Sequence, residues 1–284
     1  MSEVATAVTL MTGLGLLFGA LLAVAYRFLR VEEDPRLEAV EHLLPGNNCG
    51  ACGQPGCAAF AGTLLTGEAA PGGCTVASAG ALEEIAALLG VDVGSQEKRI
   101  ARLKCAGGRV NARSLGDYRG MGSCRAAVVV DGGALACSWG CLGLADCERA
   151  CSFEAIWMNE EALPVVEPAL CTACGDCVDV CPQDLFVLVP ESQHLFVQCN
   201  SPLAGEDAVS RCSVACDACG RCAADAPANT IEMVNGLPVV HFDRDDAPTP
   251  AATWRCPTGA IQWLEGRQFD EDDEEETARR KGYG

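Results

Sequence analysis

Residues Cys171–Pro182, with the sequence CTACGDCVDVCP, indicate the kind of domain that this chain forms. Their spacing, C-x2-C-x2-C-x3-C-P, is the bacterial run for [4Fe-4S] clusters, in which three thiolates hold one cluster and the fourth crosses to a second one. A short loop must wrap closely around its cluster, which the small Gly175 permits, while Pro182 turns the chain away. Zinc also uses C-x2-C pairs, but four such closely packed cysteines ending in Cys-Pro favour the cluster and predict electron transfer.

The composition limits the number of domains, the redox compartment and the class of partner. The chain has 284 residues and 20 cysteines, and 49% of its residues are hydrophobic, which suffices for two or three small domains. The cysteines fall in groups rather than at the scattered spacings of a small secreted scaffold, so we expect metal ligation in a reducing compartment. The formal net charge of −19 argues against nucleic acid or anionic lipid as a partner and favours a docking partner with a basic patch.

The first long apolar stretch, residues 4–29, carries no charge before Arg27. As a helix with a rise of about 1.5 Å per residue, it is long enough to cross a bilayer once. A cleaved signal peptide is the alternative, but Met1-Ser2-Glu3 lacks the positive charge that precedes the apolar part of such a peptide. Because Arg27 and Arg30 follow the span, we expect a single-pass anchor in the cell (inner) membrane with the bulk of the chain on the cytoplasmic side.

A first cysteine group follows this apolar stretch. Asp34 has the form of an N-cap and Pro35 that of a first helical residue, so a short helix is expected there. Beyond it, a glycine-rich loop supplies three cysteines and a later position a fourth. The predicted ligands of this [4Fe-4S] cluster, with zinc as the alternative, are Cys49, Cys52, Cys57 and Cys74.

Another cysteine group lies before the Cys171 motif, with the looser spacing C-x3-C-x5-C-x3-C and Ser152 where proline is usual. The stretch Ile156–Val166 between the two groups is typical of a hairpin, so motif, hairpin and motif form the pseudo-repeat of a two-cluster ferredoxin. Crossing of the fourth cysteines then assigns two ligand sets. One is Cys137, Cys141, Cys147 and Cys181, and the other is Cys171, Cys174, Cys177 and Cys151.

The motif recurs downstream in part, with Ala226 in place of the fourth cysteine and Asn235-Gly236 as a hairpin turn signal. Residues 243–253, where the second motif belongs, contain no cysteine. Under crossed ligation, all ligands of one cluster are missing and all those of the other remain, which predicts a degenerate ferredoxin-like domain with one cluster. Its ligands are Cys216, Cys219, Cys222 and Cys256.

Four cysteines belong to no motif, namely Cys105, Cys124, Cys199 and Cys212. Three interpretations stay open for them: a fifth cluster, two disulfides, or buried free thiols. A cytoplasmic location disfavours the disulfides. Whether these residues bind anything depends on their meeting in space.

The apolar stretch, Val31–Pro35, the Cys49–Cys57 loop, the Cys141–Cys147 loop and the Cys171 motif together resemble the B subunit of the Rnf electron transport complex, in the long form with an added ferredoxin domain. The resemblance implies a membrane assembly that moves electrons between reduced ferredoxin and NAD while it translocates Na+ or H+. It implies that this chain accepts electrons from soluble ferredoxin and relays them to the other, membrane-bound subunits of a translocase. At Ala226, the chain departs from the family pattern.

The predicted fold is a membrane-anchored multi-domain α+β chain with one N-terminal transmembrane helix, a small helical [4Fe-4S] domain and two ferredoxin-like domains built as ββ/α pseudo-repeats. The predicted bounds are 4–29 for the transmembrane helix, 31–92 for the N-terminal [4Fe-4S] domain, 103–198 for the two-cluster domain with its N-terminal extension, 199–264 for the one-cluster domain and 265–284 for an acidic disordered tail.

No catalytic acid–base pair, phosphate loop or nucleotide fingerprint is visible in the sequence. We therefore expect four [4Fe-4S] clusters, with a fifth in question, and no independent catalytic site. Ion pumping is expected to belong to partner subunits, because the apolar helix has no charged residue in its middle. A membrane-tethered iron–sulfur redox sensor is the competing function, but no output domain is visible in the sequence. A zinc-binding scaffold is a third alternative, and it predicts a colourless protein, whereas iron–sulfur clusters predict a brown one.

Overall fold

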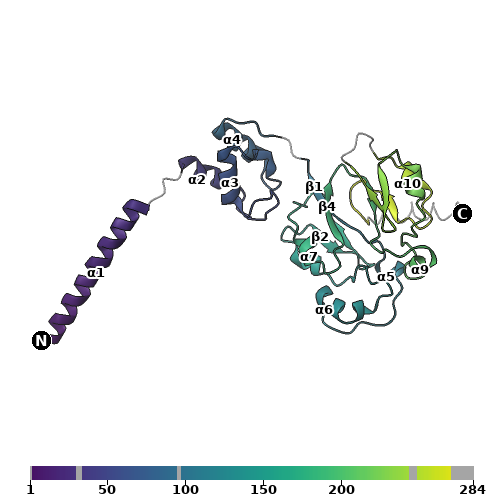
Figure 1. Cartoon of the computed structure of the whole chain (residues 1–284), viewed down its shortest axis with the longest axis horizontal. Helices are drawn as coiled ribbons and strands as arrows, with labels where there is room; N and C mark the ends of the chain where they lie inside the picture. Colours follow the sequence, from purple (N-terminus) through teal and green to yellow (C-terminus); the bar gives the residue numbers. More distant parts are fainter. Residues whose placement is uncertain (1, 30–33, 95–96, 243–247, 270–284) are drawn as a thin grey trace.

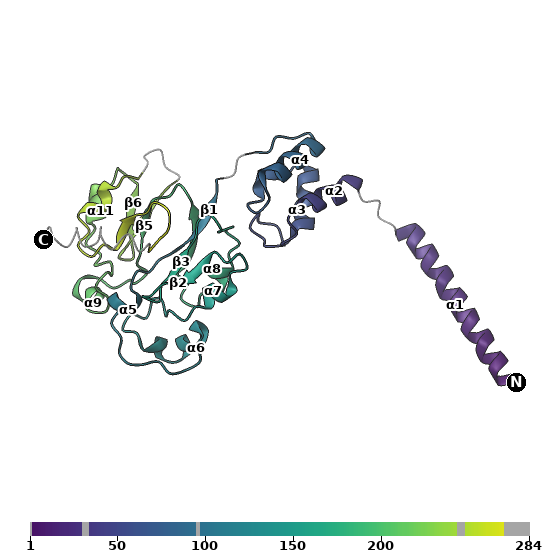
Figure 2. The same ribbon diagram turned by 180° about the vertical axis from the view of Figure 1, so that it is seen from behind.

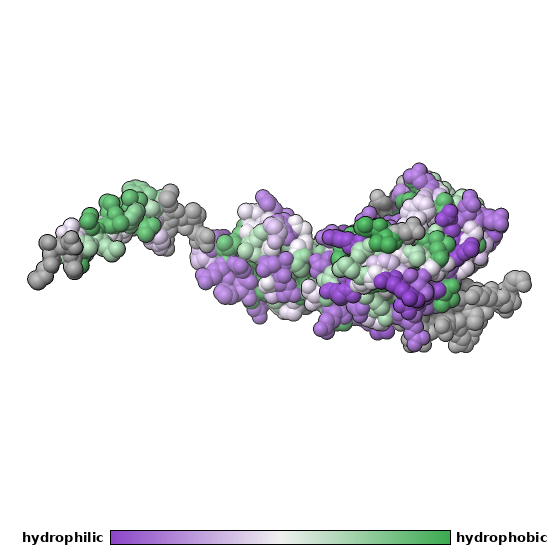
Figure 3. Space-filling model, turned by 90° about the horizontal axis from the view of Figure 1, so that it is seen from below, coloured by the Kyte–Doolittle hydropathy of each residue, from purple (hydrophilic) through white to green (hydrophobic). Residues whose placement is uncertain are grey.

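The computed structural model describes residues 2–29, 34–94, 97–242 and 248–269 (Figure 1). Its first element, α1 (Ser2–Leu29), is a continuous helix that extends away from the folded units. Residues Ala5–Phe28 have a mean hydropathy of 2.1 and meet the length and composition of a membrane span. The helix surface is largely apolar, whereas hydrophilic residues cover much of the folded units (Figure 3). Arg30, which supports the predicted orientation, lies outside the described residues.

A small helical unit follows α1. It contains α2 (Pro35–Leu43), α3 (Cys57–Thr66), the 3-10 turn η1 (Pro71–Gly73) and α4 (Ala79–Leu89). The predicted cap of α2 is confirmed, because the Asp34 carboxylate accepts the N–H of Arg36 at 2.9 Å. The helices share one apolar core, in which Val40, Phe60 and Ile85 are buried.

The first ferredoxin-type unit is closed by pairing of its first strand with its last. β1 (Arg99–Leu103) and β4 (Phe186–Pro190) run antiparallel, with Leu103 opposite Phe186. Between them in sequence, β2 (Ile156–Met158) and β3 (Pro164–Val166) form the predicted hairpin. The short helices α7 (Asp146–Ala150) and α8 (Asp176–Val180) pack side by side (Figure 2).

An insert separates β1 from α7 in this unit. It contains α5 (Gly108–Asn111), α6 (Cys124–Val129) and the 3-10 turn η2 (Asp131–Ala134). It carries Cys124 and Cys137 and lies to one side of the β-strands (Figure 1).

The second ferredoxin-type unit repeats the plan of an outer strand pair and an inner hairpin. β5 (Leu195–Val197) pairs with β8 (Ile261–Trp263), and β6 (Ile231–Val234) pairs with β7 (Leu237–Val240). The helices are α9 (Gly205–Val209), α10 (Arg221–Asp225) and α11 (Ala251–Trp254). Asn235 and Gly236 form the predicted turn with φ values of 51° and 82°.

The strand pairs move two predicted domain bounds. Since β5 pairs with β8, the second unit includes residues from 195 onward rather than from 199. Since β1 pairs with β4, the first unit includes residues from 99 onward rather than from 103. β1 and β5 are short, and each is recognised as part of its unit only because it pairs with a strand far along the chain.

Residues 265–269 were expected to belong to a disordered tail, but they pack on the first unit. Gln268 is only 1% exposed. Its side-chain amide donates to the carbonyl of Leu103 at 2.8 Å and accepts the N–H of Leu103 at 2.9 Å. The Gln268 side chain thus supplies hydrogen-bond partners at the edge of β1, in the manner of a neighbouring strand.

A second contact fastens the same segment. The guanidinium of Arg267 forms an ion pair with Glu167 at 2.6 Å and lies over the ring of Trp157 at 5.4 Å. The acidic run 270–276, on which the prediction of a tail depended, lies outside the described residues.

Replacement Gln268→Ala tests this contact. It leaves the N–H and C=O of Leu103 without their side-chain partners, at a cost of about 1–3 kcal/mol. We expect the Leu103 amide to exchange with deuterium roughly ten- to hundred-fold faster. The Lys104 amide, which donates to the carbonyl of Leu185 at 2.8 Å, is the internal control. Unchanged exchange at Leu103 would show that Gln268 does not protect the strand edge.

Candidate iron–sulfur sites

Two cysteine loops, residues 171–177 and 216–222, share one backbone conformation. Each has two left-handed residues, one before and one after its middle cysteine, and this alternation coils the loop tightly. The left-handed residues are Ala173 (φ 58°) and Gly175 (φ 95°) in one loop and Ala218 (φ 59°) and Gly220 (φ 71°) in the other. Each loop leads directly into a short helix, α8 or α10, whose second residue is the third cysteine.

The loop of residues 141–147 has this same conformation, although one cysteine is absent. Gly143 and Ala145 have φ values of 67° and 64°, and Cys147 is the second residue of α7. Leu144 therefore occupies the position of the middle cysteine. The motif begins at Cys141, not at Cys137 as the sequence spacing suggested, and it needs no extra residues.

A hollow beside this loop receives a cysteine from the insert. Its cysteine lining consists of Cys124, Cys141, Cys147 and Cys181. The predicted set contained Cys137 in place of Cys124, whereas the lining of this hollow favours Cys124. The physical reason is Leu144, which offers no thiol at the middle position and leaves a gap that Cys124 fills from α6.

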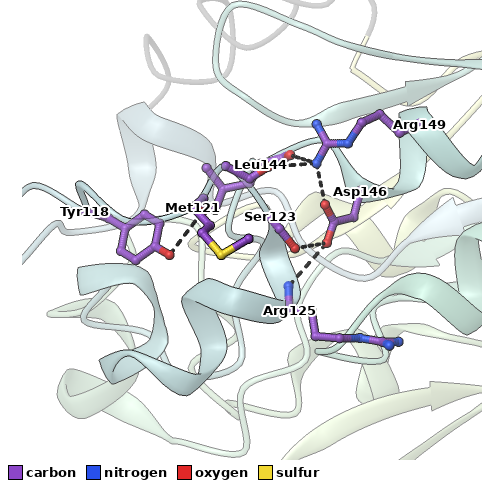
Figure 4. Close-up of polar contacts among 8 residues, drawn as sticks. Tyr118, Met121, Ser123, Arg125, Leu144, Asp146 and Arg149 are labelled. Carbon is purple, nitrogen blue, oxygen red and sulfur yellow. Dashed lines mark hydrogen bonds and ion pairs between the residues drawn. The ribbon is translucent and has the colours of Figure 1, made fainter.

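A buried carboxylate holds the Cys124 segment against α7 (Figure 4). Asp146, which is 8% exposed, precedes Cys147. Its Oδ2 accepts the hydroxyl of Ser123 at 3.0 Å and the backbone N–H of Arg125 at 3.2 Å. Because Ser123 and Arg125 flank Cys124, these bonds fix the position of its backbone relative to Cys147.

Arg149, which also lies on α7, adds to this contact between the insert and α7, which we call the clamp (Figure 4). It forms an ion pair with the Asp146 carboxylate and donates to the carbonyls of Gly122 at 2.9 Å and Leu144 at 2.8 Å. Burial by itself would raise the pKa of Asp146, but the hydrogen bonds from Arg125, Arg149 and Ser123 outweigh it and hold the pKa below its ordinary value. The stabilisation is therefore present above the unfolded pKa of about 3.9 and is lost as the pH falls through the folded value.

The cysteines of the other predicted set in the first unit are neighbours. The thiol of Cys177 interacts electrostatically with those of Cys171, Cys174 and Cys151, the last of which comes from the end of α7. It also interacts with Cys147, a member of the hollow beside the Cys141 loop. The two cysteine groups of this unit are therefore neighbours.

The N-terminal unit forms its own hollow, and the cysteines in its lining are Cys49, Cys52, Cys57 and Cys74, as predicted. The Asn48 side chain closes the loop by accepting the N–H of Cys57 at 2.8 Å. A contact leads from this unit to the next: Thr75, which follows Cys74, donates its hydroxyl to the carbonyl of Thr172 at 2.8 Å. Thr172 itself follows Cys171.

The second unit also brings its predicted cysteines together. Cys216 interacts electrostatically with Cys222 and Cys256, and Cys222 interacts with Cys219. Cys216 and Cys222 are buried, whereas Cys219 is exposed. Ala226, which replaces the fourth cysteine of the motif, packs against an apolar core that includes Ala252. Residues 243–247, part of the stretch without cysteine, lie outside the described residues.

Three of the four unassigned cysteines meet at the boundary of the two ferredoxin-type units, and Cys137 joins them. Cys105 interacts electrostatically with Cys212 and Cys137, and Cys137 interacts with Cys199. Cys124, the remaining unassigned cysteine, lies in the hollow beside α7 instead. The predicted grouping of the four leftovers is therefore corrected by one exchange, Cys137 for Cys124.

The cysteines are available for metal ligation. All twenty lie within the described residues and are free thiols, so none of them forms the disulfides left open above. Burial raises the pKa of several: to about 11 for Cys105 and Cys222, and to about 12 for Cys147 and Cys216. Such thiols stay protonated at neutral pH until a metal replaces the proton.

The spread of the thiols fits clusters better than single ions. A zinc ion draws four sulfurs onto one atom at about 2.3 Å each, whereas each thiolate of a [4Fe-4S] cluster binds a different iron atom. Within the described residues, no group of three or more His, Cys, Asp or Glu side chains is placed to hold one metal ion. Cysteines gathered four at a time around a hollow fit the larger group.

Comparisons with known proteins identify two iron–sulfur regions in the chain. A family model for an Fe-S cluster matches residues 44–76, and one for a 4Fe-4S binding domain matches residues 164–186. The chain is 41% identical over 202 residues to the B subunit of the Na(+)-translocating ferredoxin:NAD(+) oxidoreductase complex of Acetobacterium woodii, covering 71% of this chain and 61% of that protein.

An apolar helix long enough to span a membrane, followed by iron–sulfur domains, defines an iron–sulfur protein with a candidate membrane helix. The B subunit of the ion-translocating oxidoreductase complex of Methanosarcina acetivorans is 34% identical over 92% of this chain and 98% of its own length. The B subunit of the proton-translocating ferredoxin:NAD(+) oxidoreductase complex of Clostridium ljungdahlii is 34% identical over 92% of this chain and 93% of its own length. The chain therefore belongs to the family of B subunits of ion-translocating oxidoreductase complexes, the Rnf family.

Replacement Asp146→Ala should release the insert from α7. Hydrogen bonds to a charged group contribute about 1.5–3 kcal/mol each, so the Arg125 amide should exchange with deuterium at least roughly ten-fold faster. Asp117→Ala is the matched control, because Asp117 lies in the same insert but is exposed and pairs with Arg119 at 3.8 Å. Equal exchange in both variants would rule out the clamp.

Proposed function

We propose that this chain is the iron–sulfur electron-transfer subunit of a membrane-bound Rnf-type complex, which couples electron transfer between ferredoxin and NAD to translocation of Na+ or H+. The observation that supports the proposal most directly is the nearness of successive cysteine groups: Thr75 joins the N-terminal unit to the Cys171 loop, and Cys177 interacts with thiols of both groups of the first ferredoxin-type unit. The relatives bear the names of ferredoxin:NAD(+) oxidoreductase subunits that translocate Na+ or protons.

The proposed ligands form four sets, each suited to one [4Fe-4S] cluster, a group that accepts and releases one electron at a time. They are Cys49, Cys52, Cys57 and Cys74 in the N-terminal unit; Cys151, Cys171, Cys174 and Cys177, and Cys124, Cys141, Cys147 and Cys181, in the first ferredoxin-type unit; and Cys216, Cys219, Cys222 and Cys256 in the second. The crossing of Cys151 and Cys181 between α7 and α8 brings the two sets of the first unit together.

The exit of the relay is proposed at the N-terminal unit. This unit follows α1, and we propose that α1 anchors the chain in the cell membrane with the other units on the cytoplasmic side. The Thr75 hydroxyl bond to Thr172 joins the segment after Cys74 to the segment after Cys171. Membrane-bound partner subunits would receive the electrons there and would carry out ion translocation.

The entry of the relay is proposed at the second ferredoxin-type unit, where soluble ferredoxin would bind. Cys219 is exposed there, so its cluster would lie close to a docked partner. Trp254 is 76% exposed and stands two residues before Cys256. A large exposed aromatic side chain two residues from a proposed cluster ligand is typical of the centre of a docking surface.

Reduction of the full chain by ferredoxin tests the proposed function. The chain, purified anaerobically in detergent, should be reduced by dithionite-reduced ferredoxin, and Trp254→Ala should slow this reduction roughly ten-fold or more while its iron content stays the same. Trp157→Ala is the matched control, because Trp157 lies on β2 of the other unit. No reduction by ferredoxin in a chain with its full iron content would refute the proposed electron donor.

The assignment of Cys124 as a ligand has a separate test. Replacement Cys124→Ala should reduce the iron content by up to about four atoms per chain and remove one electron paramagnetic resonance signal. Adding Leu144→Cys restores a thiol at the middle position of the loop, so the double variant should regain the iron and the signal. Leu144→Ala in the same background supplies no thiol and should not rescue. Full iron in Cys124→Ala alone would remove Cys124 from the ligand set.

A further inference from the structure

Four chain segments from both ferredoxin-type units meet at the boundary between the units, and each carries one cysteine. They carry Cys105 after β1, Cys137 after η2, Cys199 after β5 and Cys212 after α9. The N–H of Ala106 donates to the carbonyl of Gln198 at 3.1 Å, so the segments of Cys105 and Cys199 are joined through neighbouring residues.

The segments of Cys137 and Cys212 are fastened to the same place. Cys212 forms an isolated antiparallel bridge with Ala112. The N–H of Ala136 donates to the carbonyl of Arg113 at 2.9 Å, and the guanidinium of Arg211 donates to the carbonyl of Ala136 at 2.8 Å. Backbone hydrogen bonds, rather than chance proximity of side chains, therefore hold these cysteines near one another.

The sulfur atoms themselves converge beside Gly107. A methyl group at Gly107 would stand 3.4 Å from the sulfur of Cys212 and 3.6 Å from that of Cys105. Cys212 and Cys137 interact electrostatically with each other, and both interact with Cys199. Every member of the group thus has at least two of the others as neighbours.

The sulfur of Cys105 lies in an environment that favours a thiolate bound to metal. It is buried and accepts two backbone N–H groups, from Gly107 at 3.4 Å and from Cys141 at 3.3 Å. Backbone N–H groups directed at sulfur stabilise its negative charge and set the potential of iron–sulfur clusters. The positive charge of Arg211 acts in the same sense on a second member of the group, Cys137.

We infer that Cys105, Cys137, Cys199 and Cys212 are the ligands of a fifth [4Fe-4S] cluster, which connects the two ferredoxin-type units. The connection to the first unit runs through the Cys141 N–H, because Cys141 lines the hollow beside α7. The connection to the second unit runs through Cys199, which interacts electrostatically with Cys216. The site rests on the hydrogen bonds, sulfur positions and electrostatic interactions given above, whereas its role as a connection rests on the proposed electron relay.

Counting iron in single-residue variants tests the site. The full chain in detergent should contain about twenty iron atoms, and Cys137→Ala and Cys199→Ala should each retain about sixteen. Both variants should lose the same electron paramagnetic resonance signal, whereas Cys181→Ala should lose a different one. Shared loss between Cys137→Ala and Cys181→Ala would overturn the inference, and so would full iron in Cys199→Ala.

A variant that keeps every cysteine guards against misfolding as the cause. Gly107 has a φ of −67°, which suits alanine, so Gly107→Ala changes the space beside two sulfurs without removing a ligand. We expect it to shift the signal that Cys199→Ala removes and to leave the others unchanged. Gly80→Ala is the matched control, since the added methyl group would have nothing within 4 Å. No spectral change in Gly107→Ala would contradict the proposed position of the cluster.

The connecting role is separated from the site by rapid freezing after mixing with reduced ferredoxin. In Cys199→Ala, we expect reduction of the second-unit cluster to persist and rapid reduction of the other clusters to be lost. Rapid reduction of all remaining clusters would refute the connection but not the ligand set. Failure of ferredoxin to reduce even the unaltered chain would refute the proposed donor and leave the iron counts as the test of the site.

Discussion

Crossed placement of cysteines is the constraint on which the ferredoxin-type units depend. Cys151 ends α7 but belongs with the Cys171 loop, and Cys181 ends α8 but belongs with Cys147. Neither half of the first unit therefore completes a site by itself, and α7 must pack against α8 before either group of thiols is assembled. The outer strand pair β1 and β4 has the same property, because its members lie at opposite ends of the unit.

This dependence explains how an insert can contribute to the first unit without changing its fold. The loop of residues 141–147 keeps the left-handed residues and the length of the loop at Cys171, so its backbone does not require a cysteine at the middle position. In the proposed ligand set, the missing thiol comes from α6, and the Asp146 carboxylate fixes that helix to the start of α7. In a local motif, the cysteine is part of the loop. Here, hydrogen bonds to one buried carboxylate hold a cysteine from another segment beside the loop.

The sequence predicts local features well and long-range ones poorly, for identifiable reasons. The Asp34 cap, the Asn235-Gly236 turn and the hairpin of residues 156–166 depend on neighbours in sequence, and all are present. Cysteine spacing does not reveal where the loop at residue 141 begins, because Leu144 carries no signal of its position except its equal distance from Cys141 and Cys147. Long-range partners account for the other errors. Gln268 was assigned to a tail because the adjacent acidic run dominates the local composition, yet its partner Leu103 stands far earlier in the chain.

The loss of one cysteine group from the second unit helps to explain why cysteines gather at the boundary between the two ferredoxin-type units. In the first unit, two cysteine groups are neighbours because both halves supply cysteines to them. In the second unit, Ala226 packs against an apolar core that includes Ala252, so a single group remains there. That group includes the exposed Cys219, and Cys216 faces Cys199 at the boundary. A ferredoxin-type unit with one cluster can still form the end of a linear electron relay, provided that a cluster site lies at the boundary between the units. The cysteines gathered beside Gly107 meet that condition with ligands from both units, so formation of the site would also fix the two units to each other.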